Sequence, residues 1–136
     1  MDAEILLSKL MNKKRERLII NSDENVSNEI INNYNILLER RSKKEPIAYI
    51  VNQREFWSKD FYVNKHTLIP RPETELLCEN VIKLFKDKEF NFLDIGTGTG
   101  CILLSILSEL KKAEGIGIDV SKKAIDVAKK NSINFN

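Results

Sequence analysis

The chain contains few of the residues that metal sites and catalytic triads commonly use. Its 136 residues include one histidine, His66, and two cysteines, Cys78 and Cys101. A lone histidine argues against a metal centre or a Ser-His triad, and we place His66 in a loop. The cysteines are far apart in sequence and lack metal-ligand spacing, so we expect two buried free thiols, as in a reducing compartment. No metal ligand is therefore assigned.

The chain also lacks a long apolar run and a strong net charge. No stretch reaches the roughly 18–20 apolar residues of a membrane span, and Asp2 and Glu4 interrupt any signal-peptide pattern. The net charge is only +2, which gives no reason to expect nucleic-acid binding. We expect the basic clusters at 13–17 and 40–44 to be solvated helix ends. These features predict a cytoplasmic globular protein without direct contact to membrane or nucleic acid.

Helical periodicity dominates the first 45 residues. Apolar side chains over residues 2–12 form one stripe, for which Asp2 is the expected N-cap. Between Val26 and Leu38 the apolar positions recur at steps of three and four, which is the spacing of an amphipathic helix. The sequence therefore predicts a helical module over residues 1–45. Such helices need one another, or further helices, to bury their apolar faces.

The pattern changes to short strands over residues 46–72. The runs Arg54–Trp57 and Phe61–Val63 are aromatic or β-branched and flank Ser58–Asp60, so they predict a β-hairpin. Two prolines then stiffen the chain, and the second, Pro72, suits the first turn of a following helix. We treat residues 46–72 as a linker with a hairpin.

Strands and helices alternate over residues 73–136. Strands are predicted over Phe90–Ile95 and Ile116–Val120, with a nearly all-apolar, buried helix over Cys101–Leu110 between them. Ser121 is the expected cap of a last helix. A strand–helix–strand unit of this spacing forms a right-handed crossover in a parallel sheet. The chain is thus predicted to be α/β, with a helical module and a hairpin before the first part of a Rossmann-like domain.

A glycine-rich loop, Asp94-Ile95-Gly96-Thr97-Gly98-Thr99-Gly100, follows the first of these strands. Glycine lets the backbone turn sharply and approach a ligand closely. A phosphate-binding P-loop is excluded, because Cys101 and not lysine follows Gly100. The G-x-G-x-x-G dinucleotide pattern also fails, since its last glycine would fall on Cys101. The alternative that the loop is a turn without a ligand remains.

The G-x-G-x-G spacing after Asp94 resembles the first motif of class I methyltransferases, which bind S-adenosylmethionine. Asp119 ends the next strand, about 20 residues beyond the loop, where a carboxylate can accept hydrogen bonds from ribose hydroxyls. The resemblance implies that cofactor contacts come from the loop and from this acid, namely Gly96, Thr97, Gly98, Thr99, Gly100 and Asp119. It gives the cofactor class but not the methyl acceptor.

Further segments of the chain narrow the acceptor. Four segments resemble, in order, the release factor glutamine methyltransferases of the HemK/PrmC family: Glu45–Tyr49, Arg54–Ser58, Leu68–Glu75 and Asp94–Gly100. The resemblance implies transfer of a methyl group to the glutamine side-chain amide nitrogen in the Gly-Gly-Gln motif of peptide chain release factors. It also implies that the helical module helps to hold the release factor. Pro70–Glu73 would either line the site or join the hairpin to the next helix.

Two departures from the family pattern stand out. Asn52 occupies a position where the family usually has glycine, and asparagine tolerates a positive φ better than most residues. The Asn-Pro-Pro-Tyr motif that grips the acceptor amide in the family is missing, because the only prolines are Pro46, Pro70 and Pro72. We therefore assign no catalytic residue and expect an incomplete family member that begins inside the helical domain and is inactive alone.

Incompleteness would also leave one flank of the two-stranded sheet uncovered at Ile95 and Ile118, which favours association or aggregation. Two other functions stay open. One is an adenine N6 nucleic-acid methyltransferase, whose acceptor motif is similar; the other is a non-catalytic chain that only binds a partner.

Overall fold

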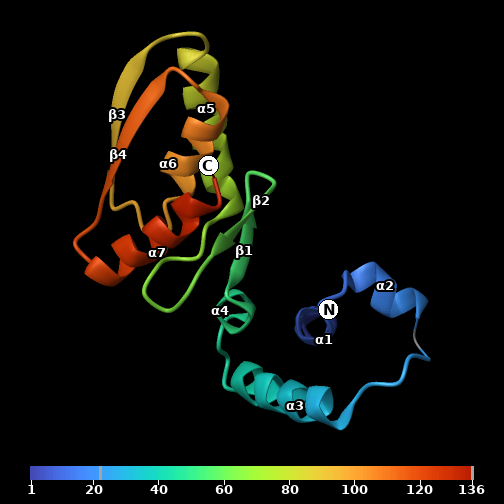
Figure 1. Cartoon of the computed structure of the whole chain (residues 1–136). Helices are drawn as coiled ribbons and strands as arrows, with labels where there is room; N and C mark the ends of the chain where they lie inside the picture. Colours follow the sequence, from blue (N-terminus) through green and yellow to red (C-terminus); the bar gives the residue numbers. More distant parts are fainter. Residues whose placement is uncertain (22, 136) are drawn as a thin grey trace. The chain divides into compact units, whose positions relative to one another are not determined.

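The chain forms two compact units, Met1–Val51 and Asn52–Asn136, in a computed structural model that describes residues 1–21 and 23–135 (Figure 1). The α/β class expected from the sequence is confirmed. The finer division at residues 45 and 72 stays a prediction. Within the described residues, no helix has both the length and the apolar character that a membrane span requires.

The first unit is entirely helical. Its helices are α1 (Asp2–Met11), α2 (Arg15–Ile20), α3 (Asn28–Ser42) and α4 (Ile47–Val51). Helix α1 contacts the other three, and its Leu6 is fully buried, together with Ala48 and Ile50 of α4. The helical module predicted from periodicity therefore folds around one short apolar centre.

Polar contacts correct one expectation for this unit. Asp2 is the first residue of α1 and not its cap, which is Met1. The Asp2 carboxylate instead accepts a hydrogen bond from Arg41 Nε at 2.7 Å. Arg40 likewise forms a paired contact with the Glu45 carboxylate, at 2.8 and 2.6 Å. Arg40 and Arg41 remain about 40% exposed while they form these ion pairs, so the basic cluster is a helix end in contact with solvent, as expected, with carboxylates beside it.

The second unit begins with a β-hairpin of β1 (Gln53–Phe56) and β2 (Lys59–Tyr62), paired antiparallel. The turn lies at Trp57 and Ser58, one residue earlier than the sequence suggested, and both residues have positive φ, of 54° and 53°. A two-residue turn with this backbone matches the twist of the two strands. The hairpin prediction is confirmed, with Lys59 and Asp60 belonging to a strand and not to the turn.

Asn52 precedes the hairpin with a φ of 54°. This is the left-handed region, in which asparagine is tolerated and glycine is favoured. Its side-chain Nδ2 donates to the Val63 carbonyl at 3.1 Å, and its own carbonyl accepts from Val63 N at 3.4 Å. Asparagine therefore preserves the turn expected for the usual glycine, and adds a hydrogen bond that glycine cannot make.

The remaining elements form the crossover unit. They are a 3₁₀ turn, η1 (Pro72–Thr74), then α5 (Glu75–Phe85), β3 (Phe90–Ile95), α6 (Cys101–Glu109), β4 (Ala113–Ile118) and α7 (Lys122–Ile133). Strands β3 and β4 pair in parallel from Phe90 with Ala113 to Ile95 with Ile118. Strand β4 starts three residues earlier than predicted and ends two residues earlier. The earlier start results from pairing with β3, which includes Ala113–Gly115, residues that do not favour a strand by themselves.

One face of the β3–β4 pair is covered by α6, which also packs on α5 (Figure 1). Cys101, Leu104 and Ile106 of α6 are buried, as the apolar run predicted. Gly115 of β4 permits this close packing, because a Cβ there would lie 2.6 Å from Leu103 Cδ1. Phe56 and Phe61 of the hairpin belong to the same core.

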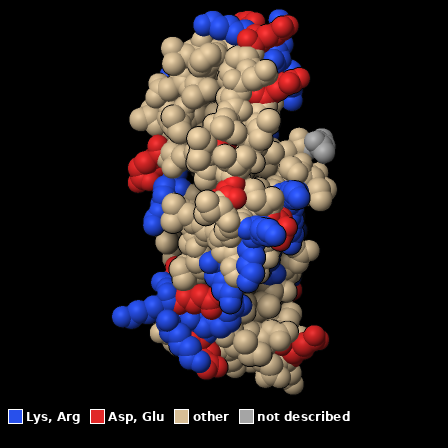
Figure 2. Space-filling view, turned by 90° about the vertical axis from the view of Figure 1, so that its left-hand side faces the viewer, with Lys and Arg blue, Asp and Glu red and all other residues tan. Residues whose placement is uncertain are grey.

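The opposite face of the pair is apolar and exposed. Ile95 is 76% exposed and Ile116 is 66% exposed, and Leu93 and Ile118 lie on the same face. Figure 2 shows a broad uncharged area over these strands, with charged side chains gathered toward its ends. The expectation of an uncovered flank at Ile95 and Ile118 is confirmed. A surface of this kind promotes association.

Replacing Ile116 by lysine should reduce self-association of the 136-residue chain. Little packing is lost, because the side chain is mostly exposed, while the apolar surface is interrupted by a charge. Sedimentation velocity should shift toward monomer, and the fluorescence of a bound apolar dye should fall.

The matched control is Asn91→Lys, which adds the same charge on the same exposed face without removing apolar area. Equal sedimentation profiles for Ile116→Lys and for the unmodified chain would contradict an associative role of this face.

Candidate functional site

The glycine-rich loop leaves the carboxyl end of β3 and is fastened to the carboxyl end of β4. The Ile118 carbonyl accepts hydrogen bonds from Gly96 N at 2.8 Å and from Thr97 N at 2.9 Å. The loop then closes on itself, since Gly100 N donates to the Thr97 carbonyl at 2.8 Å. Helix α6 starts directly afterwards. This is the edge of a parallel sheet at which ligands of open α/β folds bind.

The three alternating glycines all adopt positive φ, of 79°, 53° and 79° at Gly96, Gly98 and Gly100. Most residues other than glycine and asparagine would be strained there. The positions differ in their surroundings. A Cβ on Gly96 would meet nothing within 4 Å, whereas one on Gly100 would lie 3.2 Å from Leu104 Cδ1 and 3.4 Å from Ala128 Cβ. Gly96 thus borders open space, and Gly100 permits close packing of two helices.

Asp119 connects the loop to the start of α7. Its Oδ2 accepts from Gly98 N at 3.0 Å and its Oδ1 accepts from Ser121 N at 2.9 Å. Ser121 in turn caps α7, as predicted, by accepting from Ala124 N at 3.2 Å. A carboxylate has about four lone-pair positions, so two remain after these contacts. Asp119 is half-buried and holds its carboxylate beside the loop.

The two loop threonines face inward. Thr97 and Thr99 are buried; Thr97 Oγ1 donates to Asp94 Oδ2 at 2.7 Å, and the Thr99 side chain hydrogen-bonds the Cys101 thiol. Their side chains therefore hold the loop together. A ligand at this edge would meet these two residues through their main chain.

The two cysteines are buried free thiols, as expected. Burial raises the pKa of Cys78 to about 11, with a smaller contribution from the nearby Cys101. Burial also raises the pKa of Cys101, although the hydrogen bond with Thr99 opposes the change. Both thiols therefore stay protonated at neutral pH and are poor nucleophiles. Within the described residues, no group of acids, cysteines and histidine is arranged to hold a metal.

Trp57, in the turn of the hairpin, is hydrogen-bonded to the two helices α5 and α6. Glu75 Oε1 accepts from the main-chain nitrogen of Trp57 at 2.9 Å, and Trp57 Nε1 donates to Glu109 Oε1 of α6 at 3.0 Å. Pro70 is buried, while Arg71, Pro72 and Glu73 are exposed. The two roles considered for Pro70–Glu73, a wall of the site and a joint between hairpin and helix, both stay predictions.

His66 lies in the loop after β2, as placed from the sequence. Its main-chain nitrogen donates to Asn64 Oδ1 at 2.9 Å. This contact does not involve the imidazole side chain, and we assign it no catalytic role.

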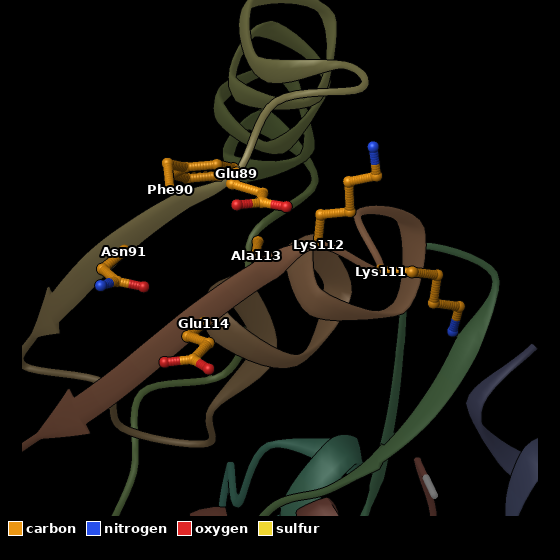
Figure 3. Close-up of a pocket in the computed structure, with 7 residues that line it drawn as sticks. All are labelled: Glu89, Phe90, Asn91, Lys111, Lys112, Ala113 and Glu114. Carbon is orange, nitrogen blue, oxygen red and sulfur yellow. The ribbon is translucent and has the colours of Figure 1, made fainter.

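A hollow of about 520 Å³ lies at the amino ends of β3 and β4, away from the loop (Figure 3). Its lining mixes acids and lysines, and Figure 3 shows the side chains of Lys111 and Lys112 extending away from the carboxylates of Glu89 and Glu114. A smaller, mainly apolar cavity of about 190 Å³ lies behind the loop, between α6 and α7, where it is lined by Gly100, Leu103 and Ala128 among others. Neither hollow lies on the open side of the glycine-rich loop at Gly96, so that side of the loop is distinct from both.

The comparisons with known families agree with this geometry. Residues 1–51 match the PrmC N-terminal domain, and residues 86–136 match a methyltransferase domain. The release factor glutamine methyltransferase of Aliivibrio fischeri is 45% identical over 96% of this chain and 46% of its own length. The corresponding protein of Caulobacter vibrioides is 38% identical over 99% of this chain and 47% of its own length.

The chain is similar along nearly its whole length to the first part of release factor glutamine methyltransferases. A bifunctional methyltransferase of Rickettsia prowazekii is also similar, with 42% identity over all of this chain and 30% of that protein. The chain thus spans about half the length, or less, of the curated relatives it matches. The resemblance expected from the sequence and the start of a methyltransferase domain are confirmed.

Sequence reasoning missed Asn131 of α7. This residue is fully buried, and its side-chain amide hydrogen-bonds both Tyr62 of β2 and Thr99 of the loop. The available signal was a polar residue on an otherwise apolar helix face, three and four positions after Ala128 and Val127.

Gly117→Ala should disturb the loop from beneath. A Cβ on Gly117 would lie 2.8 Å from Thr97 Oγ1 and 3.0 Å from Leu103 Cδ2, so Thr97 or α6 must shift. We expect a loss of roughly 1–3 kcal/mol in the free energy of unfolding. Chemical denaturation measures this loss, and amide resonances of residues 94–100 should move.

Gly96→Ala is the matched control, because its added Cβ meets no neighbour and tests only the cost of the positive φ. Unchanged stability and loop resonances in Gly117→Ala would show that the space beneath the loop is more adaptable than the structure indicates.

Proposed function

We propose that this chain supplies the helical substrate module and the cofactor loop of a release factor glutamine methyltransferase. Such a protein moves the methyl group of S-adenosylmethionine to the glutamine side-chain amide nitrogen in the Gly-Gly-Gln motif of release factors. The observation that carries the proposal is the loop Gly96–Gly100, held open at the carboxyl end of β3 beside the Asp119 carboxylate. The names of the relatives support the substrate.

The residues present fit the cofactor. The open space at Gly96 allows a ligand to approach the backbone, and three positive-φ glycines give the loop a shape that larger residues would not hold. The remaining lone pairs of Asp119 can accept hydrogen bonds from ribose hydroxyls. S-adenosylmethionine carries no phosphate, so the absence of a P-loop lysine is consistent with it. The proposed contacts are Gly96, Thr97, Gly98, Thr99, Gly100 and Asp119, the threonines through their main chain.

The role of these residues is binding and orientation. S-adenosylmethionine, when bound, supplies an electrophilic methyl group. The loop and Asp119 would fix its position, and accurate placement of two reactants lowers the barrier to direct transfer. We assign no general base and no metal to this chain. The amide that accepts the methyl would need a grip that the present 136 residues, with prolines only at 46, 70 and 72, do not supply.

The division of labour follows the two units. We propose that residues 1–45 help to hold the release factor, that residues 46–72 connect, and that residues 73–136 hold the cofactor. The match of residues 1–51 to the PrmC N-terminal domain supports the first of these roles. The setting would be the cytoplasm, where release factors act on ribosomes.

The 136-residue chain should bind S-adenosylmethionine, and Asp119→Ala should weaken binding at least tenfold. The substitution removes the ribose acceptor and also frees Gly98 N, which it now holds. Isothermal calorimetry measures the dissociation constants, with circular dichroism on each sample to establish folding.

Asp126→Ala is the control, since it removes an exposed aspartate from α7. Equal weakening by both substitutions, or absence of binding in a folded sample, would refute the cofactor site and would favour a chain that only binds a partner.

A chimera tests the substrate. Residues 1–136 joined to the remaining part of the Aliivibrio fischeri relative should transfer labelled methyl groups from S-adenosylmethionine to a release factor. A release factor with its motif glutamine replaced by alanine should stay unlabelled. The 136-residue chain alone should transfer nothing, because it lacks the acceptor grip.

Three outcomes would contradict these statements. Transfer by the chain alone would refute the expected inactivity. Label on adenine in DNA rather than on the release factor would favour the nucleic-acid alternative. A folded chimera that binds the cofactor and labels neither substrate would refute the proposed acceptor.

A further inference from the structure

Asn131 is a fully buried polar side chain with all its hydrogen-bonding groups engaged. Its Oδ1 accepts from Tyr62 N at 2.7 Å, and its Nδ2 donates to the Tyr62 carbonyl at 3.0 Å and to the Thr99 carbonyl at 2.8 Å. Burying an amide costs free energy unless its partners replace water. Here one amide satisfies three main-chain groups from two segments that are distant in the sequence.

The bond to Thr99 acts on the loop through the planarity of the peptide. The Thr99 carbonyl and the Gly100 N–H belong to the same peptide unit, which is planar and trans. Holding the carbonyl toward Asn131 therefore directs the Gly100 N–H the opposite way, where it donates to the Thr97 carbonyl at 2.8 Å. That bond closes the loop immediately before α6. The orientation of one side chain on α7 thus determines how the loop closes.

Other contacts place the same helix beneath the loop. Ala128 lies three residues before Asn131, so both share a face of α7, and a Cβ on Gly100 would come within 3.4 Å of Ala128 Cβ. Asp119, just ahead of α7, holds Gly98 N. The loop is therefore supported at Gly98, Thr99 and Gly100 in turn, and only the support at Thr99 also reaches the hairpin.

We propose that Asn131 is a positioning residue for the cofactor loop, which it couples to Tyr62 at the end of strand β2. The proposal rests on the proposed function, because it assumes that the loop binds S-adenosylmethionine. Asn131 itself is buried behind the loop and does not touch the ligand in this arrangement. Its loss loosens the Thr99–Gly100 peptide and reduces affinity without removing any contact group.

The test compares Asn131→Asp with Asn134→Asp in the 136-residue chain. Aspartate at 131 keeps the size and the acceptor for Tyr62 N, but it turns an oxygen toward the two carbonyls that Nδ2 now serves. We expect amide hydrogen exchange at Gly100 to rise at least tenfold relative to exchange at Leu110, a buried residue whose N–H donates to the Ile106 carbonyl at 2.9 Å and reports the stability of the unit. The dissociation constant for S-adenosylmethionine should rise at least tenfold. Asn134 is exposed, so its variant should change both quantities less than twofold.

The two readouts separate the two proposals. If the unmodified chain binds no cofactor, the proposed function fails, while Gly100 exchange still tests the coupling. If Gly100 and Leu110 exchange rise in parallel in the variant, Asn131 is only structural and the positioning proposal is refuted.

Asn131→Ser, which is smaller and uncharged, serves if the aspartate variant does not fold. A measurement on the unmodified chain is also decisive: the side-chain NH₂ resonances of Asn131 should exchange slowly and should shift on addition of S-adenosylmethionine. Fast exchange or unmoved resonances in a sample that binds the cofactor would overturn the proposal.

Discussion

The carbonyl of Ile118 is the constraint on which the arrangement of the site depends. It ends strand β4 and accepts hydrogen bonds from both Gly96 and Thr97, so the loop that leaves β3 is anchored to the neighbouring strand. Parallel strands run in the same direction, so their carboxyl ends lie at the same edge of the sheet. Here the last residues of the two strands, Ile95 and Ile118, pair with each other. This pairing also brings Asp119, the next residue after β4, beside Gly98. Without the parallel pairing, neither the loop nor the acid would be in place.

Several side chains of the second unit fasten the hairpin to the elements that follow it. Glu75 holds the turn of the hairpin at Trp57, and the Trp57 indole reaches Glu109 on α6. Asn131 then joins the far end of the hairpin, at Tyr62, to the loop. The hairpin is therefore bound at its turn to α5 and α6, and at its base to α7 and the glycine-rich loop.

The two faces of the small sheet have opposite character. Glycine at positions 115 and 117 lets α6 lie close against one face, and Phe90 and Phe92 complete the cover there. The other face presents leucine and isoleucine side chains to solvent. Apolar surface of this kind gains free energy when it is covered, so this face is the part of the unit most prone to association.

The sequence by itself determined those features that depend only on residues close together in the chain. Alternating glycines after Asp94 defined the loop, Ser121 defined a helix start, and the apolar spacing over Val26–Leu38 defined an amphipathic helix. The family followed from short ordered segments. The sequence was wrong by one residue for the hairpin turn at Trp57 and Ser58, because no propensity rule favours tryptophan at positive φ.

Tertiary structure alone decided the contacts between distant segments. Asp2 pairs with Arg41 instead of capping a helix, strand β4 extends back to Ala113 because a partner strand is present, and the loop threonines turn inward. The position of Asn131 on an apolar helix face indicated burial, but only the packing of α7 showed that its partners are Tyr62 and Thr99. Hydrogen bonds between residues far apart in the chain depend on where the whole backbone places them, and no local pattern records that.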